Sequence, residues 1–149
     1  MKIEEAINQK KPFTSVQQRL MVNLLFTNNW LQGEMKAFLK ESDVTIQQYN
    51  ILRILRGAQK PISTSIIRNR MIDKMSDTTR LINRLQKKSW VTKVTCPKDK
   101  RLVDIQITQA GLALLERIDQ KSSRIDTLLN HLTEEESNKL NTLLDKLRG

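Results

Sequence analysis

The residues of this chain that could do chemistry on a ligand fall in two short runs. The first run lies on one face of an expected helix and consists of Ser76, Asp77, Arg80, Asn83, Arg84 and Lys87. An arginine can bind guanine O6 and N7 with two hydrogen bonds, an asparagine can bind adenine likewise, and a serine hydroxyl reaches phosphates or base edges. This face therefore indicates a helix that reads DNA, although a solvated polar face would have the same composition.

The second run is the charged segment formed by Lys98, Asp99, Lys100 and Arg101. Asp99 is placed to hold the guanidinium of Arg101 by a charge-assisted hydrogen bond. An arginine at the tip of a hairpin can enter a narrow minor groove, where A·T-rich sequence enhances the negative potential. Because turn lysines are often merely solvated, the pairing of an acid with Arg101 is the more informative part.

Both runs lie in the most basic part of the chain. The 149 residues carry a net charge of +10, and residues 68–101 hold 11 Lys and Arg against 3 Asp and Glu, which is a net +8. Clustered positive charge is typical of a protein that binds a polyanion, because neutralised phosphates release their counterions. A solvated charged face remains the alternative, and a membrane-surface patch is disfavoured because no basic amphipathic helix with Trp and Phe accompanies the charge.

Two short helices and a hairpin must position these side chains. Leu81, Ile82 and Leu85, together with Thr78, predict the buried face of a helix over residues 75–88. A shorter helix begins near Ser63, and so tight a connection between two helices is typical of a helix-turn-helix. After this pair the apolar period changes to two, which predicts strands over 90–95 and 101–108 and thus a β-hairpin with a basic tip, called a wing.

Longer helices flank this region. Capping-box patterns and helical spacing predict helices over about 13–40, from 45 to Gly57, over about 109–131, and from Thr133 to the end of the chain. The predicted fold is mainly α with a small β-hairpin wing. It is a single domain over 1–149, with a winged helix-turn-helix at about 45–108 between terminal helices at about 13–40 and 109–149.

Two runs of the sequence carry a family resemblance. Residues 99–111, DKRLVDIQITQAG, resemble the wing signature of the MarR (multiple antibiotic resistance regulator) family, in which Asp-x-Arg leads through an alternating strand into Leu-Thr-x-x-Gly. Residues 79–88, TRLINRLQKK, resemble the recognition helix of that family and add Thr79 to the candidate DNA-binding residues. Two residues depart from the pattern. Ile107 replaces the usual Leu, and Ser89 stands where a glycine is common, which predicts a different turn geometry.

The resemblance implies a homodimeric transcriptional regulator that binds a pseudo-palindromic operator in double-stranded DNA and acts as a repressor whose DNA binding is modulated by a small molecule. In such a dimer the terminal helices of both chains intertwine. The apolar residues expected there are Val16, Leu20, Leu24, Leu128, Leu132, Leu140, Leu143, Leu144 and Leu147. The same stripe could instead be core within one chain.

Other residues are weaker candidates. Trp30, Phe38 and Tyr49 could line the effector pocket that members of this family have, although aromatic residues at helical spacing are core residues by default. Cys96 is interpreted as an incidental hairpin cysteine rather than a redox switch, and His131 as a helix C-terminal cap rather than a ligand.

The composition argues against other classes of protein. One histidine, one cysteine and no carboxylate cluster beyond Glu134 to Glu136 leave no catalytic set and no metal site, so an enzyme and a cofactor are not expected. Acids at the N-terminus and the absence of a long apolar run predict a cytoplasmic chain without a signal or a membrane span. The alternative function is a winged-helix module for protein interaction or RNA association, because fold does not fix the partner.

Overall fold

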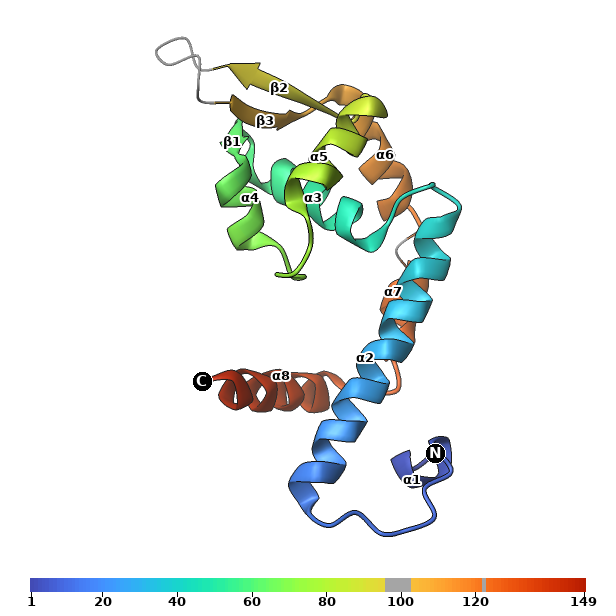
Figure 1. The fold of residues 1–149 in the computed structure, drawn as a ribbon. Helices are drawn as coiled ribbons and strands as arrows, with labels where there is room; N and C mark the ends of the chain where they lie inside the picture. Colours follow the sequence, from blue (N-terminus) through green and yellow to red (C-terminus); the bar gives the residue numbers. More distant parts are fainter. Residues whose placement is uncertain (96–102, 122) are drawn as a thin grey trace. The chain divides into compact units, whose positions relative to one another are not determined.

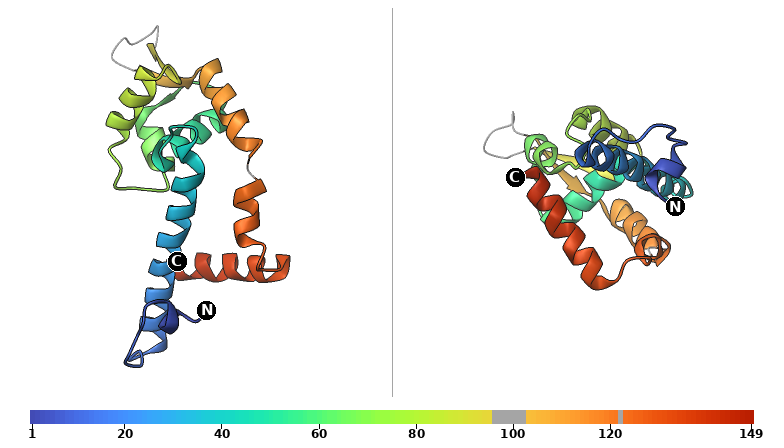
Figure 2. Two further views of the ribbon diagram at one scale, coloured as in Figure 1. Left: turned by 90° about the vertical axis from the view of Figure 1, so that its right-hand side faces the viewer. Right: turned by 90° about the horizontal axis from the view of Figure 1, so that it is seen from below.

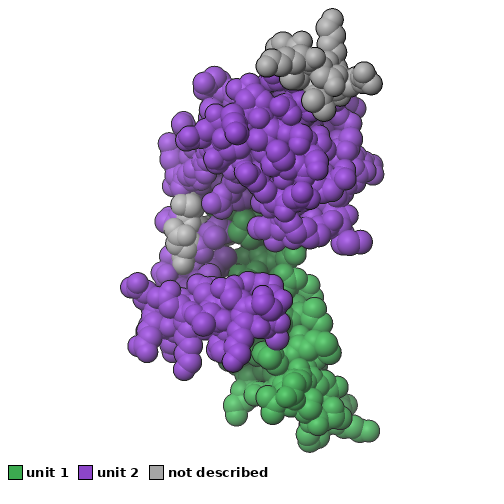
Figure 3. Space-filling model, turned by 90° about the vertical axis from the view of Figure 1, so that its left-hand side faces the viewer, with its two compact units in different colours: residues 1–46 green, residues 47–149 purple. Residues whose placement is uncertain are grey.

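The structure is a computed structural model, and it describes residues 1–95, 103–121 and 123–149. The chain divides into two compact units, residues 1–46 and residues 47–149 (Figure 3). The first unit holds two helices, and the second holds the remaining helices and the three strands.

The first unit consists of α1 (Ile3–Ala6) and the long helix α2 (Val16–Lys40). The helix expected over about 13–40 is present and begins at Val16, because Ser15 is its N-cap and its side chain accepts a hydrogen bond of 3.0 Å from the Gln18 amide. Arg19 Nε lies 2.6 Å from Glu4 Oε1 and ties the two helices together. The sequence analysis did not predict α1, since a single helical turn is too short to establish a period.

The second unit begins with α3 (Ile46–Ala58), α4 (Thr64–Arg70) and α5 (Thr78–Lys87). Ser63 caps α4 as expected, since its side chain accepts from the Ile66 amide. The expected start of α5 at residue 75 is wrong by three residues. Asp77, whose carboxylate accepts from the Arg80 amide, is the N-cap, and aspartate strongly favours that position.

Three short strands form one antiparallel sheet, β1 (Ile62–Ser63), β2 (Val91–Thr95) and β3 (Val103–Ile107), in the order β1-β3-β2. Val91 pairs with Ile107 and Thr95 with Val103, which confirms the predicted hairpin within the described residues. The sequence analysis missed β1, because two residues cannot display an alternation. Its pairing of Ile62 with Ile105 adds a third strand to the hairpin.

The last helices are α6 (Gln109–Asp119), α7 (Ser123–Asp126) with the 3-10 turn η1 (Thr127–Leu129), and α8 (Glu134–Arg148). The single helix expected over 109–131 is therefore wrong. The Lys121 amide donates a hydrogen bond to the Ile118 carbonyl, so α6 ends in a tight final turn. Two serines, which have modest helix propensity, follow in the sequence. The capping box of Thr133 and Glu136 at the start of α8 is confirmed.

The core of the second unit lies between helices and sheet. The sheet packs against α4 and α5, as the views of Figures 1 and 2 also show. Apolar side chains from α3, α4, α5, α6 and β3 are fully or almost fully buried, namely Ile51, Leu52, Leu55, Ile67, Ile82, Leu85, Ile105, Leu114, Leu115 and Ile118. This arrangement holds α5 in a fixed orientation and leaves its other face to solvent.

Candidate nucleic-acid interface

The exposed face of α5 carries the polar side chains that the sequence analysis selected. Arg80, Asn83, Arg84 and Lys87 are exposed, as is Thr79 beside them. The opposite face is packed, with Thr78, Ile82 and Leu85 buried and Leu81 half-buried. Donors and acceptors for base edges and donors for phosphates therefore lie together on one side of a helix whose other side is anchored in the core.

The N-terminal end of α5 is organised by Asp77. Its Oδ1 atom lies 3.0 Å from the Arg80 amide nitrogen and satisfies one of the free donors at the helix start. Ser76, the preceding residue, is half-buried. A carboxylate repels phosphate, so this geometry assigns Asp77 an orienting role at the head of the helix, from which it can also accept a hydrogen bond from a cytosine amino group.

A lysine from the sheet reaches this face. Lys93 Nζ on β2 donates a hydrogen bond of 3.2 Å to Asn83 Oδ1 on α5. Lys93 was not among the residues selected from the sequence, because alternation places it on the same face of β2 as the buried Val91, opposite the buried Ile105, where an apolar residue is expected. The Asn83 amide oxygen, which would accept a hydrogen bond from the adenine amino group, is thus already bound by the Lys93 ammonium group. This hydrogen bond joins β2 to the polar face of α5.

The C-terminal end of α5 corrects the expectation for Ser89. The Trp90 amide bonds to the Leu85 carbonyl and the Ser89 amide to the Gln86 carbonyl, which is a Schellman motif. Ser89 has a φ of 60°, the left-handed conformation that a glycine would adopt there. The turn geometry is therefore that of a glycine-ended helix, with a serine held in it.

The turn between α4 and α5 is fastened to α3, a feature that the sequence analysis did not find. The Ile72 amide donates to Asn50 Oδ1 at 2.9 Å, and Gln47 Nε2 donates to Asp73 Oδ2 at 3.3 Å. Hydrogen bonds from the Ser76 side chain, Gln47 and the Met75 amide hold the pKa of the Asp73 carboxyl below its usual range. Asn50 and Gln47 thereby set the position of the chain where it enters α5.

A small pocket of about 170 Å³ adjoins this turn and the polar face of α5. It is lined by Gln47, Ser76, Asp77, Arg80, Leu81 and Arg84. Its wall carries two arginines and the carboxylate of Asp77, so it presents both donors for anionic groups and an acceptor.

The tip of the hairpin lies outside the described residues. Lys98, Asp99, Lys100 and Arg101, the candidate wing residues, fall in the segment 96–102, as does Cys96. The two strands that lead to that segment are described, and their pairing ends at Thr95 and Val103.

The candidate effector residues occupy different environments. Trp30 is exposed and Phe38 is buried, both on α2, while Tyr49 on α3 is half-buried beneath the Arg53 guanidinium, 5.7 Å from the ring centroid. His131 is exposed and follows η1.

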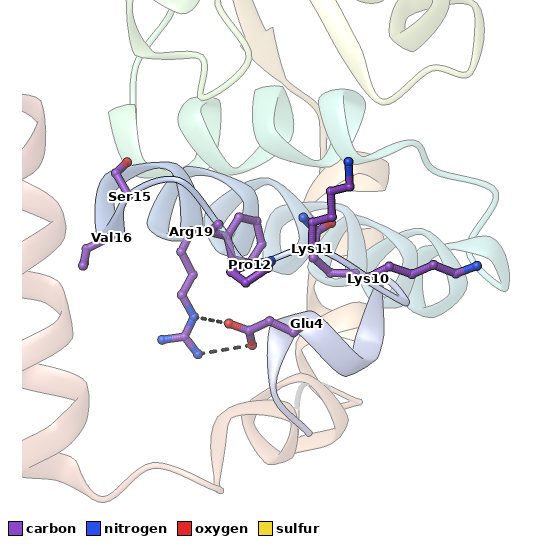
Figure 4. Close-up of a pocket in the computed structure, with 9 residues that line it drawn as sticks. Glu4, Lys10, Lys11, Pro12, Ser15, Val16 and Arg19 are labelled. Atoms are coloured by element: carbon purple, nitrogen blue, oxygen red, sulfur yellow. Dashed lines mark hydrogen bonds and ion pairs between the residues drawn. The ribbon is translucent and has the colours of Figure 1, made fainter.

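Two other cavities are lined by residues outside α5. One, of about 560 Å³, is formed within the first unit by residues of α1, the loop after it and the start of α2, where Glu4 meets Arg19 (Figure 4). The other, of about 330 Å³, is lined by Leu55, Arg56, Gln59, Lys60, Gln106, Ile107, Gln109 and Leu112. Of the helices that the described ranges contain, none has the length and apolar character to cross a bilayer.

A capped helix-turn-helix followed by a β-hairpin defines a winged helix-turn-helix, a class of DNA-binding domain. Residues 44–103 match the sequence model of the MarR family. The transcriptional regulator PecS of Dickeya dadantii is 31% identical over 115 residues, which are 75% of this chain and 69% of PecS. The chain belongs to the MarR family of transcriptional regulators.

Two further relatives agree with this assignment. The transcriptional repressor IacR of Pseudomonas putida is 28% identical over 112 residues, which are 74% of this chain and 66% of IacR. A crystal structure of a mutant MarR from Escherichia coli, complexed with operator DNA, superposes with a TM-score of 0.76 at 26% identity, covering 86% of this chain and 92% of that one. These relatives are regulators rather than enzymes.

Proposed function

We propose that this protein is a homodimeric regulator that binds a pseudo-palindromic operator and represses transcription by occupying it. The observation that carries the proposal is the exposed face formed by Arg80, Asn83 and Arg84 on a helix that is capped at both ends and packed against a sheet. The chain is similar to a relative crystallised with operator DNA and to another that is named a repressor, and both similarities support the same function.

We assign recognition of the operator sequence to α5 and the wing. Arg80 and Arg84 are suited to guanine and to phosphate, and Asn83 to adenine once Lys93 turns from its oxygen to a phosphate. In this proposal Arg101, aimed by Asp99, enters the minor groove beside the helix.

Homodimerisation is supported by the exposure of apolar side chains on the terminal helices. Val16 on α2 is 78% exposed and Leu143 on α8 is 54% exposed. Leu20, Leu132, Leu140 and Leu147 are exposed as well, and Leu24, Leu128 and Leu144 are half-buried. Exposed apolar side chains repeated along a helix, as on α2 and on α8, need a partner surface, and a second copy would place two reading helices on successive major grooves.

We also propose that a small molecule controls binding to the operator. Trp30, Phe38 and Tyr49 are the residues assigned to its pocket, and the effector would act by favouring a dimer whose two reading helices no longer match the operator spacing.

The proposal is tested by selecting bound sequences from a random duplex pool and measuring affinity for the selected operator by electrophoretic shift. Arg84→Ala is expected to weaken operator binding by about 10-fold or more, as the loss of a good arginine–guanine contact does. Arg101→Ala is expected to weaken it by a similar factor, because the minor groove loses the cation that its negative potential attracts. Lys10→Ala, which removes an exposed charge from the first unit, serves as the matched control.

Unchanged affinity in both arginine variants would contradict the assigned reading residues. A pool that yields no preferred duplex would contradict sequence-specific binding and favour a module for protein or RNA. Two half-sites with a constant spacing are expected, because a twofold symmetric dimer imposes them.

A further inference from the structure

The turn that precedes α5 exposes two large apolar side chains. Met75 is 93% exposed and Ile72 is 85% exposed. Both belong to the turn between α4 and α5, at the end of α5 away from the β2–β3 hairpin (Figure 1). An exposed apolar side chain gains free energy when a partner covers it, so both side chains are available to a partner that binds beside α5.

The backbone that carries Met75 is held by a network of hydrogen bonds. The Met75 amide donates to Asp73 Oδ1 at 3.0 Å, and Asp73 is itself bonded to Gln47 of α3. The turn is further held where Lys74 Nζ donates to the Asn69 carbonyl at 2.6 Å and where Ile72 donates to Asn50. The side chain of Met75 therefore projects from a fixed main chain.

Met75 also lies at the end of α5 that reads bases. It stands two residues before the N-cap Asp77, and in helix-turn-helix proteins the N-terminal residues of the recognition helix contact base edges in the major groove. Residues 68–87 around it hold six Lys and Arg against two acids, Asp73 and Asp77, a net charge of +4. Both carboxylates already accept backbone hydrogen bonds, from the Met75 and the Arg80 amides. Such surroundings favour a polyanion over an apolar protein surface as the partner of this turn.

We propose that Met75 is a specificity-determining residue that recognises thymine through its 5-methyl group in the major groove. Among the groups that the bases present in this groove, the thymine methyl is the apolar one, and the others are hydrogen-bond donors and acceptors. Met75 would thus contact the one group of thymine, its methyl, that Arg80 and Asn83 cannot reach by hydrogen bonding. The inference rests on the proposed operator binding.

The test replaces each thymine of the selected half-site in turn by deoxyuridine, which lacks only the 5-methyl group. Wild-type protein is expected to lose affinity about fourfold at one thymine per half-site, the fold-change that corresponds to about 0.8 kcal/mol per buried carbon group. Met75→Ala is expected to bind the thymine operator more weakly and to show no loss on that replacement. Met75→Leu, which keeps an apolar side chain, should retain the sensitivity.

Two variants serve as matched controls. Ile72→Ala removes the other exposed apolar side chain of the turn and is expected to retain the full fourfold sensitivity. Lys87→Ala removes a charge from α5 and is expected to lower affinity for both operators equally, with a shallower salt dependence. Circular dichroism melting of each variant establishes that it is folded.

The inference is overturned if Met75→Ala keeps the wild-type response to deoxyuridine, or if Ile72→Ala abolishes that response instead. It is also overturned if no single replacement weakens wild-type binding. Failure of the proposed function is a separate result, since wild-type protein would then bind the selected and a scrambled duplex with equal affinity.

Discussion

At the scale of single residues, the candidate interface depends on side chains that orient others. Asp77 caps α5, and Asp73 holds the amide of Met75. Neither of these contacts needs a ligand, so they are present before DNA arrives. Preorganisation of this kind limits the entropy lost when the interface forms.

Ser89, at the C-terminal end of α5, is one of the residues with a positive φ. Its left-handed conformation is unfavourable for a residue with a Cβ atom, and glycine adopts it freely. Ser89→Gly is therefore expected to raise the free energy of unfolding by about 0.5–1 kcal/mol, measured by urea denaturation. Ser89→Ala keeps the Cβ atom and is the matched control, for which no such gain is expected. A gain of the same size in both variants would contradict the strain argument.

At the scale of elements, the helix α6 is joined to the base of the wing by close contact. The Trp90 carbonyl accepts from the Thr108 amide at 3.0 Å, and Thr108 Oγ1 donates to the Ser89 carbonyl at 2.7 Å. Gly111 lies in the first turn of α6, where a Cβ atom would overlap the Trp90 carbonyl oxygen and lie 2.8 Å from Ile107 Cγ1. Backbone cannot move aside as a flexible side chain can, so this position admits only glycine without rearrangement.

Gly111→Ala is accordingly expected to destabilise the protein by about 1–3 kcal/mol, the usual effect of overpacking. Gly57 in α3 is the matched control, because a Cβ atom added there meets nothing within 4 Å. Gly57→Ala should stabilise the protein by up to about 1 kcal/mol, since alanine is the better helix former. Thermal and urea unfolding of the two variants would measure the contrast. Equal effects of the two substitutions would contradict the assigned close approach.

At the scale of the whole molecule, the proposed assembly concerns the apolar residues of α2 and α8. Leu143→Glu is expected to weaken dimerisation by about 100-fold or more, because a twofold interface would bury two unpaired carboxylates. Analytical ultracentrifugation would measure the dissociation constant, and operator affinity should fall with it. Asn141→Glu, on the opposite side of α8, adds the same charge and should leave the dimer intact. Dimers of wild-type affinity in Leu143→Glu would contradict the proposed interface.

Much of the fold follows from local patterns in the sequence. Apolar residues at helical spacing, alternation along residues 103–107 and caps such as Ser63 and Thr133 each depend on neighbours within a few residues. The elements of the winged helix, and the polar face of α5, could therefore be predicted. Elements of two to four residues, such as β1 and α1, could not, because a period needs more residues than they contain.

The arrangement of the site had to come from the tertiary structure. Asn50 and Ile72 are 22 residues apart in sequence and Gln47 and Asp73 are 26 apart, yet these pairs fix the turn before α5. Nothing in the local composition marks them, since an asparagine and a glutamine on a helix are usually solvated. Residue types and their spacing therefore suffice to predict which side chains could bind DNA, whereas contacts between residues distant in sequence fix the turn that holds Met75 exposed beside them.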